Sequence, residues 1–319
     1  MNFLTDRILV TGGTGLVGIS LTKRLNLLGC NVMSVGNTRG AVKYDLLDSY
    51  ETRNMFDDIE PKIVIHLAAK VGGIYANMSG KAKFYLENTL INTNVIREVQ
   101  ERKTEYVLAM GTGCAYPKKL EGSILNECEF LGGVPESTND AYAYAKRNML
   151  VHLEACREEF GLKYCYCIPA NIYGENDNFH PLYSHVVPAL VRKFVEAKRK
   201  SLPFVSVWGS GHAERDFLYI EDLIDAIICL LSLESQGVFN VATGVPIAID
   251  ELVYTIKNIM NYSGDIIYSS SFPEGQKTRL FNINKISNVG WEAKHSLKEG
   301  LEKTIEWFEK TTYKKEIIK

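Results

Sequence analysis

The fold of this 319-residue chain is decided by residues 7–18, which read Arg7-Ile8-Leu9-Val10-Thr11-Gly12-Gly13-Thr14-Gly15-Leu16-Val17-Gly18. The apolar start predicts a short strand, and the helical pattern over residues 19–28 begins directly after the last glycine. Glycines spaced GxxGxxG let the turn fold tightly, let a phosphate approach backbone N–H groups and let the helix pack on the strand. We therefore expect a dinucleotide site formed by Gly12, Thr14, Gly15, Leu16, Val17 and Gly18. The simpler alternative is a strand-to-helix turn that binds nothing.

Strand and helix patterns alternate along the first half of the chain. Strands are expected over residues 31–35, 63–67, 106–110 and 164–168, and helices over residues 49–58, 84–102 and 141–160. This order predicts an α/β, Rossmann-type, doubly wound parallel sheet. Loops, prolines and aromatics dominate residues 171–215, and a helix over 220–233 and a strand over 238–241 then return to the sheet. We expect a dinucleotide-binding domain of residues 1–172 plus about 216–244, and a smaller C-terminal α/β substrate domain of about 173–215 plus 245–319.

Composition excludes several classes of function. The net charge of −2 gives no global field that would draw the chain to nucleic acid or to an anionic membrane. No apolar run approaches about 18 residues, and residues 1–6 do not begin a signal peptide. The seven cysteines are scattered without a CxxC pair, and the histidines lack ligands at a recognised spacing. A cytoplasmic protein with reduced thiols and no metal site is expected.

Tyr142 and Lys146 lie one helical turn apart and share a helix face. An ammonium beside a phenol is expected to lower the phenol's pKa from about 10, which suits acid–base chemistry on a carbonyl or alcohol. The alternative is a solvated pair, since this spacing occurs on many helices.

The end of the second expected strand indicates which dinucleotide binds. An NAD site usually has Asp or Glu there for the ribose hydroxyls, but this chain reads Val35-Gly36-Asn37-Thr38-Arg39. Arg39 could face a 2′-phosphate, which favours NADP(H); otherwise Arg39 is a solvated loop charge.

Several longer motifs carry a resemblance to a known family. They are residues 67–74 (LAAKVGGI), 111–118 (GTGCAYPK), 142–146 (YAYAK), 169–174 (PANIYG), 177–181 (DNFHP), 184–188 (SHVVP) and 207–211 (VWGSG). With the glycine turn, they make the chain similar to the GDP-L-fucose synthase family of extended short-chain dehydrogenases/reductases, over roughly residues 7–310. The resemblance implies a 3,5-epimerase and 4-reductase that acts on GDP-4-keto-6-deoxy-D-mannose with NADPH.

The resemblance also implies roles for individual residues. Tyr142 would protonate the C4 oxygen, and Lys146 would hold the cofactor ribose. Thr112 stands where a serine is usual; its hydroxyl can still donate, but its methyl group narrows the site. Gly113 stands where the family often has a second serine. Cys114 and His185 match the pair that moves protons during epimerisation, with His180 as the competing imidazole.

Further contacts follow from the same resemblance. For the cofactor they are Ala68, Met110, Gly111, Tyr142, Lys146, Pro169, Asn171 and Ile172, beside the turn and Arg39. For the nucleotide sugar they are Asn171, His185, Lys193, Trp208, Arg215 and Arg279. Each has a simpler reading: Lys193 could be solvated, Trp208 could be core, and Arg215 could pair with Glu214 or Asp216. Glu274, Thr278 and Arg279 depart from the family's Pro-Asp-Gly-x-x-Arg-Lys pattern, so the sugar stays open.

Three hypotheses remain. The first is a bifunctional epimerase/reductase making GDP-L-fucose, favoured by Cys114 and His185. The second is a GDP-4-keto-deoxy-sugar or GDP-heptose C4 reductase with one or no epimerisation, favoured by Thr112 and the altered segment at 274–279. The third is a non-catalytic dinucleotide-binding regulator. The helices over residues 84–102 and 141–160 are expected to form a homodimer through a four-helix bundle, as extended family members commonly do.

Overall fold

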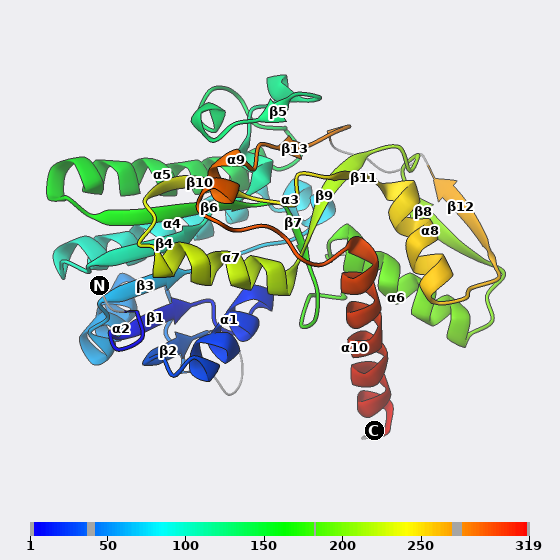
Figure 1. The fold of residues 1–319 in the computed structure, drawn as a ribbon, viewed down its shortest axis with the longest axis horizontal. Helices are drawn as coiled ribbons and strands as arrows, with labels where there is room; N and C mark the ends of the chain where they lie inside the picture. The colour runs from blue at the N-terminus through cyan, green and yellow to red at the C-terminus, as the bar shows by residue number, and fades with distance from the viewer. Residues whose placement is uncertain (1–2, 37–41, 182, 270–275, 318–319) are drawn as a thin grey trace.

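A computed structural model describes residues 3–36, 42–181, 183–269 and 276–317 (Figure 1). Arg39 and Glu274 lie outside the described residues. No helix in the described ranges is long and apolar enough to span a bilayer.

A six-stranded sheet forms the core of the molecule, and every pair of neighbouring strands is parallel. Across the sheet the strands are β10 (Gly237–Val241), β6 (Lys163–Pro169), β4 (Tyr106–Met110), β3 (Ile63–His66), β1 (Ile8–Thr11) and β2 (Val32–Val35). The chain passes from β1 to β2 on one side and then to β3 on the other, so the direction of winding reverses at β1. Ligands of such sheets bind at this reversal, next to the carboxyl ends of the strands. The predicted α/β, Rossmann-type sheet is confirmed.

Helices flank this sheet in two groups (Figure 1). One group contains α1 (Leu16–Leu27) and α7 (Ile220–Ser232), which contact each other. The other is a row of α2 (Ser49–Ile59), α4 (Lys81–Glu101) and α5 (Asp140–Phe160). The start of α1 lies three residues before the expected position, because the helix begins as soon as the glycine turn ends at Gly15.

The chain after β6 builds a second region. Strand β7 (Asn171–Tyr173) pairs with β9 (Glu214–Tyr219), which also pairs with β11 (Pro246–Ala248). Strands β8 (Phe204–Trp208) and β12 (Asp265–Ser269) pair separately. The helices here are α6 (Val186–Arg199), α8 (Ile249–Ile259) and α10 (Leu297–Ile317). The expectation of mainly loops over residues 171–215 was wrong for α6, whose buried apolar side chains recur at helical spacing.

Short elements connect the two regions. Strand β13 (Leu280–Phe281) returns to pair with β5 (Ile124–Leu125), and α9 (Asn284–Asn288) contacts β10. Helix α3 (Ile74–Ser79), which the sequence patterns did not indicate, lies just before α4. The division into two domains stays a prediction.

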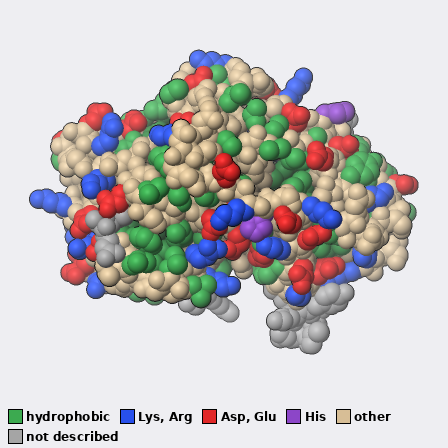
Figure 2. All heavy atoms as spheres, viewed as in Figure 1, with side chains coloured by type: hydrophobic (Ala, Val, Ile, Leu, Met, Phe, Trp, Pro, Cys, Tyr) green, Lys and Arg blue, Asp and Glu red, His purple; other side chains and the backbone are tan. Residues whose placement is uncertain are grey.

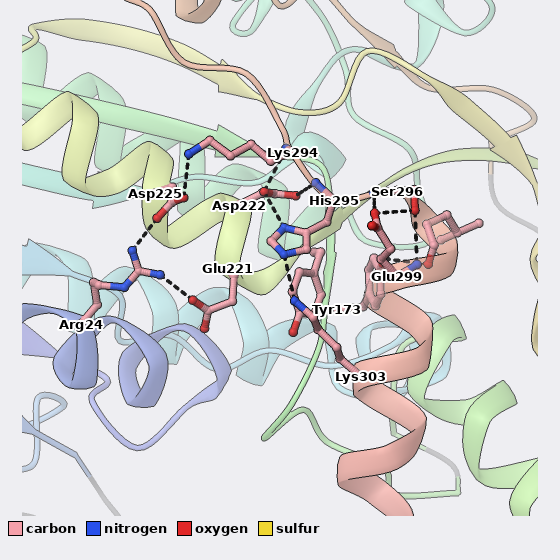
Figure 3. A network of polar contacts seen from close by, with 12 residues as sticks. Arg24, Tyr173, Glu221, Asp222, Asp225, Lys294, His295, Ser296, Glu299 and Lys303 are labelled. Carbon is pink, nitrogen blue, oxygen red and sulfur yellow. Dashed lines mark hydrogen bonds and ion pairs between the residues drawn. The ribbon is translucent and has the colours of Figure 1, made fainter. Parts of the chain in front are cut away.

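A polar network also joins the regions where α10 begins (Figure 3). The buried carboxylate of Asp222 on α7 accepts the backbone N–H groups of Lys294 and His295, each at 3.1 Å. It also contacts the His295 Nδ1 at 2.9 Å, while the Nε2 of that ring lies 3.0 Å from Lys303 Nζ. Arg24 on α1 binds Glu221 and Asp225 of α7, both at 2.6 Å. On the face in Figure 2, Lys, Arg, Asp and Glu side chains are intermingled, in keeping with the small net charge.

Candidate functional site

One cleft of about 1180 Å³ runs from the glycine turn to the second region. All predicted site residues within the described ranges line it, although they come from widely separated segments. They are Gly12, Thr14, Gly15, Leu16, Val17, Gly18, Ala68, Met110, Gly111, Thr112, Cys114, Tyr142, Lys146, Pro169, Asn171, Ile172, His185, Lys193, Trp208, Arg215 and Arg279. The fold therefore brings the predicted cofactor, substrate and catalytic groups to a single cavity.

The glycine turn forms the floor at one end of the cleft. Gly12 adopts a positive φ of 72°, and a Cβ there would lie 2.7 Å from the Ala68 backbone nitrogen. A Cβ on Gly18 would lie 2.2 Å from the Gly12 carbonyl oxygen, so α1 packs on the turn only without a side chain. The first turn of α1 has no acidic residue. Its exposed N–H groups and positive dipole end suit a phosphate, so the turn fits a dinucleotide.

Tyr142 and Lys146 project from α5 into the cleft. The Lys146 ammonium lies 5.9 Å from the centre of the Tyr142 ring and donates a hydrogen bond of 2.8 Å to the Met110 carbonyl. Burial lowers the pKa of Lys146 to about 7. The pKa of Tyr142 is raised, first by burial and then by the nearby Cys114. The expected lowering of the phenol's pKa is thus wrong for this chain by itself, because burial outweighs a lysine that is itself readily neutralised.

Cys114 lies in a short 3₁₀ turn after β4, where its backbone N–H donates to the Thr112 hydroxyl at 3.3 Å. Arg279 Nη1 donates to the Cys114 sulfur at 3.2 Å. Burial alone would raise the pKa of Cys114, but the charge of Arg279, hydrogen bonds from Thr112 and Arg279, and the charge of Arg215 outweigh it and lower that pKa. The thiol therefore has the electrostatic surroundings of a base.

Gly113 has a packing reason for lacking a side chain. A Cβ at Gly113 would lie 2.5 Å from the Phe281 ring, which β13 places beneath this turn. The departure from the family's second serine therefore accompanies an aromatic ring that takes up the space.

The two candidate imidazoles lie in different places. His185 immediately precedes α6, makes no side-chain capping hydrogen bond and lines the cleft, where desolvation lowers its pKa. His180 is exposed and stacks on Tyr183, with ring centres 4.7 Å apart, and it does not line the cleft. Within the described ranges, no three His, Cys, Asp or Glu side chains gather as they would around a metal ion.

The far end of the cleft combines a cation with an aromatic surface. Lys193 Nζ lies 5.2 Å from the Trp208 ring centre and donates 2.8 Å to the Ser206 carbonyl. Trp208 is 42% exposed, so it is not a core residue. Arg215 is buried and its Nη1 donates to the Glu214 and Lys277 carbonyls at 2.6 and 3.3 Å. Burial lowers the pKa of Lys193. A lysine and an arginine directed by hydrogen bonds to carbonyl groups suit a diphosphate.

Two further polar residues lie at the site, although the sequence analysis assigned neither of them a role. Asp177 lines the cleft; one carboxylate oxygen accepts the Asn178 N–H at 2.7 Å, and the other is buried without a partner among the described residues. Burial raises the pKa of Asp177 to about 7. Gln276 is buried against Arg279. Neither position follows a periodic or spacing rule, so contacts in the folded chain were needed to find them.

The chain is similar to known proteins in both sequence and fold. Residues 8–242 match the model of the NAD dependent epimerase/dehydratase family. The GDP-L-fucose synthase of Escherichia coli (strain K12) is 36% identical over 95% of this chain and 96% of that protein. The GDP-L-colitose synthase of Yersinia pseudotuberculosis is 32% identical, over 95% of this chain and 97% of that one. The structure of a GDP-mannoheptose C4 reductase from Campylobacter jejuni with NADP bound gives a TM-score of 0.85 at 26% identity, covering 97% of this chain and 99% of that one.

Proposed function

Because the chain belongs to the GDP-L-fucose synthase family, within the NAD dependent epimerase/dehydratase family, we propose that it is an NADPH-dependent epimerase and reductase of a GDP-linked 4-keto-6-deoxy hexose. The observation that carries this proposal is that Tyr142, Lys146, Cys114 and His185 line the one cleft that starts at the glycine turn. A reductase needs the first two residues, and an epimerase needs the last two.

For the reduction, NADPH supplies the hydride that adds to C4 of the sugar. Tyr142 donates its proton to the C4 oxygen, and its raised pKa keeps the phenol protonated at neutral pH. Lys146, fixed by the Met110 carbonyl, lies close enough to assist the phenolate that forms. The Thr112 hydroxyl is the further donor for the carbonyl oxygen.

For epimerisation, the Cys114 thiolate removes a proton from the carbon next to the ketone. The electron pair of the broken C–H bond moves to the carbonyl oxygen as an enolate, and a new S–H bond forms. His185 then returns a proton to the opposite face of the same carbon. Because its pKa is lowered, its imidazolium is a stronger acid than that of an exposed histidine. The Arg279 contact with sulfur supports this division of roles.

The two ends of the cleft suit the cofactor and the substrate respectively. The glycine turn holds the pyrophosphate of NADP(H), with Arg39 as the candidate contact of the 2′-phosphate. Lys193 and Arg215 bind the diphosphate of the sugar nucleotide, and Trp208 covers it. Asn171 and Arg279 complete the sugar site.

A narrower second function is a C4 reductase of a GDP-4-keto-deoxy sugar or GDP-heptose, with one or no epimerisation. Thr112 favours it, because a methyl group replaces open space beside the reacting carbonyl. Similarity to the colitose synthase and to the mannoheptose reductase adds support.

We further propose that the enzyme is a homodimer formed by α4 and α5 of each subunit. These helices pack on each other, and their outer faces expose Tyr85, Leu86, Leu90, Tyr144 and Val151. Apolar side chains at helical spacing on two adjacent helices are suited to a four-helix bundle.

The decisive experiment incubates the enzyme with NADPH and GDP-4-keto-6-deoxy-D-mannose in D₂O. NADPH oxidation measures reduction, and deuterium at C3 and C5, read by NMR, measures epimerisation. Oxidation with deuterium at both carbons supports the bifunctional enzyme. Deuterium at one or neither carbon would favour the narrower reductase, and oxidation only with a GDP-heptose would move the substrate to that class.

Cys114→Ser should strongly reduce deuterium uptake into the sugar. It should have a smaller effect on the rate of NADPH oxidation measured with a keto-sugar that already has the final stereochemistry. Cys128→Ser, at an exposed thiol, is the matched control. Unchanged deuterium uptake in Cys114→Ser would remove this residue as the base.

A further inference from the structure

The segment that follows residue 275 is fixed against strands β9 and β5. Glu214 N–H donates to the Lys277 carbonyl at 2.7 Å, and the Thr278 hydroxyl donates to the Glu214 carboxylate at 2.9 Å. Two residues later, β13 pairs in parallel with β5. The segment is therefore held on both sides of Arg279, and its side chains reach the cleft from a defined direction.

Within this segment, Arg279 bridges an amide and a thiol. Its Nε donates to Gln276 Oε1 at 2.7 Å, and its Nη1 donates to Cys114 Sγ at 3.2 Å. Gln276 and Arg279 are only 5% and 8% exposed. Because a guanidinium is planar and rigid, an acceptor that fixes Nε also fixes the direction in which Nη1 points.

The chemical type of residue 276 matters as much as its position. A glutamine oxygen accepts from Arg279 without a charge, so the full guanidinium charge remains directed at sulfur. A carboxylate there would make an ion pair and reduce that field. The other groups that bear on Cys114 are Arg215, which adds positive charge, and Thr112 and Tyr142, which are neutral at neutral pH.

We propose that Gln276 is a positioning residue that, by fixing Arg279, holds the Cys114 sulfur oriented and ready to take a proton. This proposal rests on the proposed function, in which Cys114 is the base of epimerisation. In this proposal Arg279 stabilises the Cys114 thiolate, in addition to its expected contact with the sugar nucleotide.

The test follows alkylation of Cys114 by iodoacetamide as a function of pH, measured on the isolated peptide by mass spectrometry. Thiolate is the reactive form, so the midpoint reports the thiol's acidity without substrate or cofactor. Gln276→Met keeps the length of the side chain but removes the hydrogen-bond acceptor. It should raise the pH midpoint of alkylation by about one unit, so that at a pH below the midpoint the thiolate fraction falls about tenfold. Gln276→Glu keeps the acceptor but adds charge, and should raise the midpoint further.

A purely structural Gln276 would be replaced well by glutamate, so an unchanged midpoint in Gln276→Glu would overturn the proposal. Cys128 is exposed and serves as the internal reference for the reagent in every sample. Thermal unfolding of each variant shows whether the fold is kept.

Arg279→Lys gives a second route that does not depend on tolerance at residue 276. Lysine keeps a positive charge but lacks the planar guanidinium that binds Gln276 and Cys114 at the same time. In the Arg279→Lys background, Gln276→Met should therefore cause no further shift of the alkylation midpoint. Additive shifts would mean that Gln276 acts by another path, and would overturn the relay.

Activity provides the link to function. Gln276→Met should slow deuterium uptake by the sugar about tenfold while NADPH oxidation by an already epimerised substrate changes little. If the parent takes up no deuterium, the proposed epimerisation fails, yet the thiol titration still decides whether the Gln276–Arg279 relay acts on Cys114.

Discussion

The Tyr142 phenol is the residue whose loss should separate chemistry from cofactor binding. Tyr142→Phe removes only the hydroxyl that is proposed to protonate the C4 oxygen, and the ring keeps its edge-on packing against Phe84. We expect turnover to fall at least about 100-fold with NADPH binding preserved, measured by steady-state rates and fluorescence titration. Tyr50→Phe, in the first turn of α2 and 69% exposed, is the control. Comparable loss in both variants would contradict a specific acid role for Tyr142.

Asp177 should make stability depend on pH in a defined direction. Burial raises its pKa from 3.8 to about 7, so between these values the folded chain holds a proton that the unfolded chain has released. Its contribution to stability is therefore present below pH 3.8 and is lost as pH rises to about 7, by at most about 1.4 kcal/mol per pH unit.

Asp177→Asn removes this titration while keeping an oxygen for the Asn178 N–H. The unfolding free energy of Asp177→Asn should rise relative to the parent across pH 4 to 7, measured by urea denaturation without ligands. A constant difference over that range would show that Asp177 has an ordinary pKa.

At the scale of residues, the sequence was informative where a motif combines chemistry with spacing. Tyr142 and Lys146 share a helix face, and Cys114 directly follows the Thr112 turn after a buried strand. The pKa of Tyr142 could not be read from spacing, because it depends on burial. The contact of Arg279 with Cys114 joins residues 165 positions apart, so only the folded chain reveals it.

At the scale of elements, Asp222 holds the segment at the start of α10 against α7 (Figure 3). The Lys294 and His295 N–H groups bind different oxygens of Asp222, so the amide group of Asp222→Asn faces one of them with hydrogens and leaves that buried donor without an acceptor. We expect the unfolding free energy to fall by about 2–4 kcal/mol, seen as a lower midpoint in thermal or urea unfolding.

Asp225→Asn is the matched control, since that carboxylate lies on the same helix but is 26% exposed and pairs with Arg24 at the surface. Its loss should cost at most about 1 kcal/mol. Equal losses in the two variants would mean that the burial of Asp222 is not what makes it important.

The helices and strands that the sequence predicted well are those with a clear hydrophobic period and sufficient length. Strand β4 has its expected bounds, and α5 begins one residue early, because long or fully apolar patterns leave little choice. Helix α6 was given no bounds in advance, because Pro188 and the flanking aromatics resemble loop composition. Strand β13 has only two residues, so its pairing with β5 carries no local pattern.

For the whole molecule, the exposed side of α4 and α5 decides the proposed assembly. Leu86 on α4 is 57% exposed and Val151 on α5 is 51% exposed, so a charge at either site costs little in a monomer. In a four-helix bundle between subunits the same charge would be buried, at a cost of several kcal/mol. Leu86→Glu and Val151→Glu should therefore each shift the mass measured by light scattering from dimer to monomer.

Leu27→Glu is the control for this shift, because Leu27 is 74% exposed on α1, in the other helix group. It should leave the mass of the parent unchanged. The proposed active-site cleft is lined by residues of both α4 and α5, namely Glu87, Ile91, Tyr142 and Lys146. Separation of subunits should then loosen these helices and lower turnover as well as mass. A monomeric parent, or variants that remain dimers, would place any interface elsewhere on the molecule.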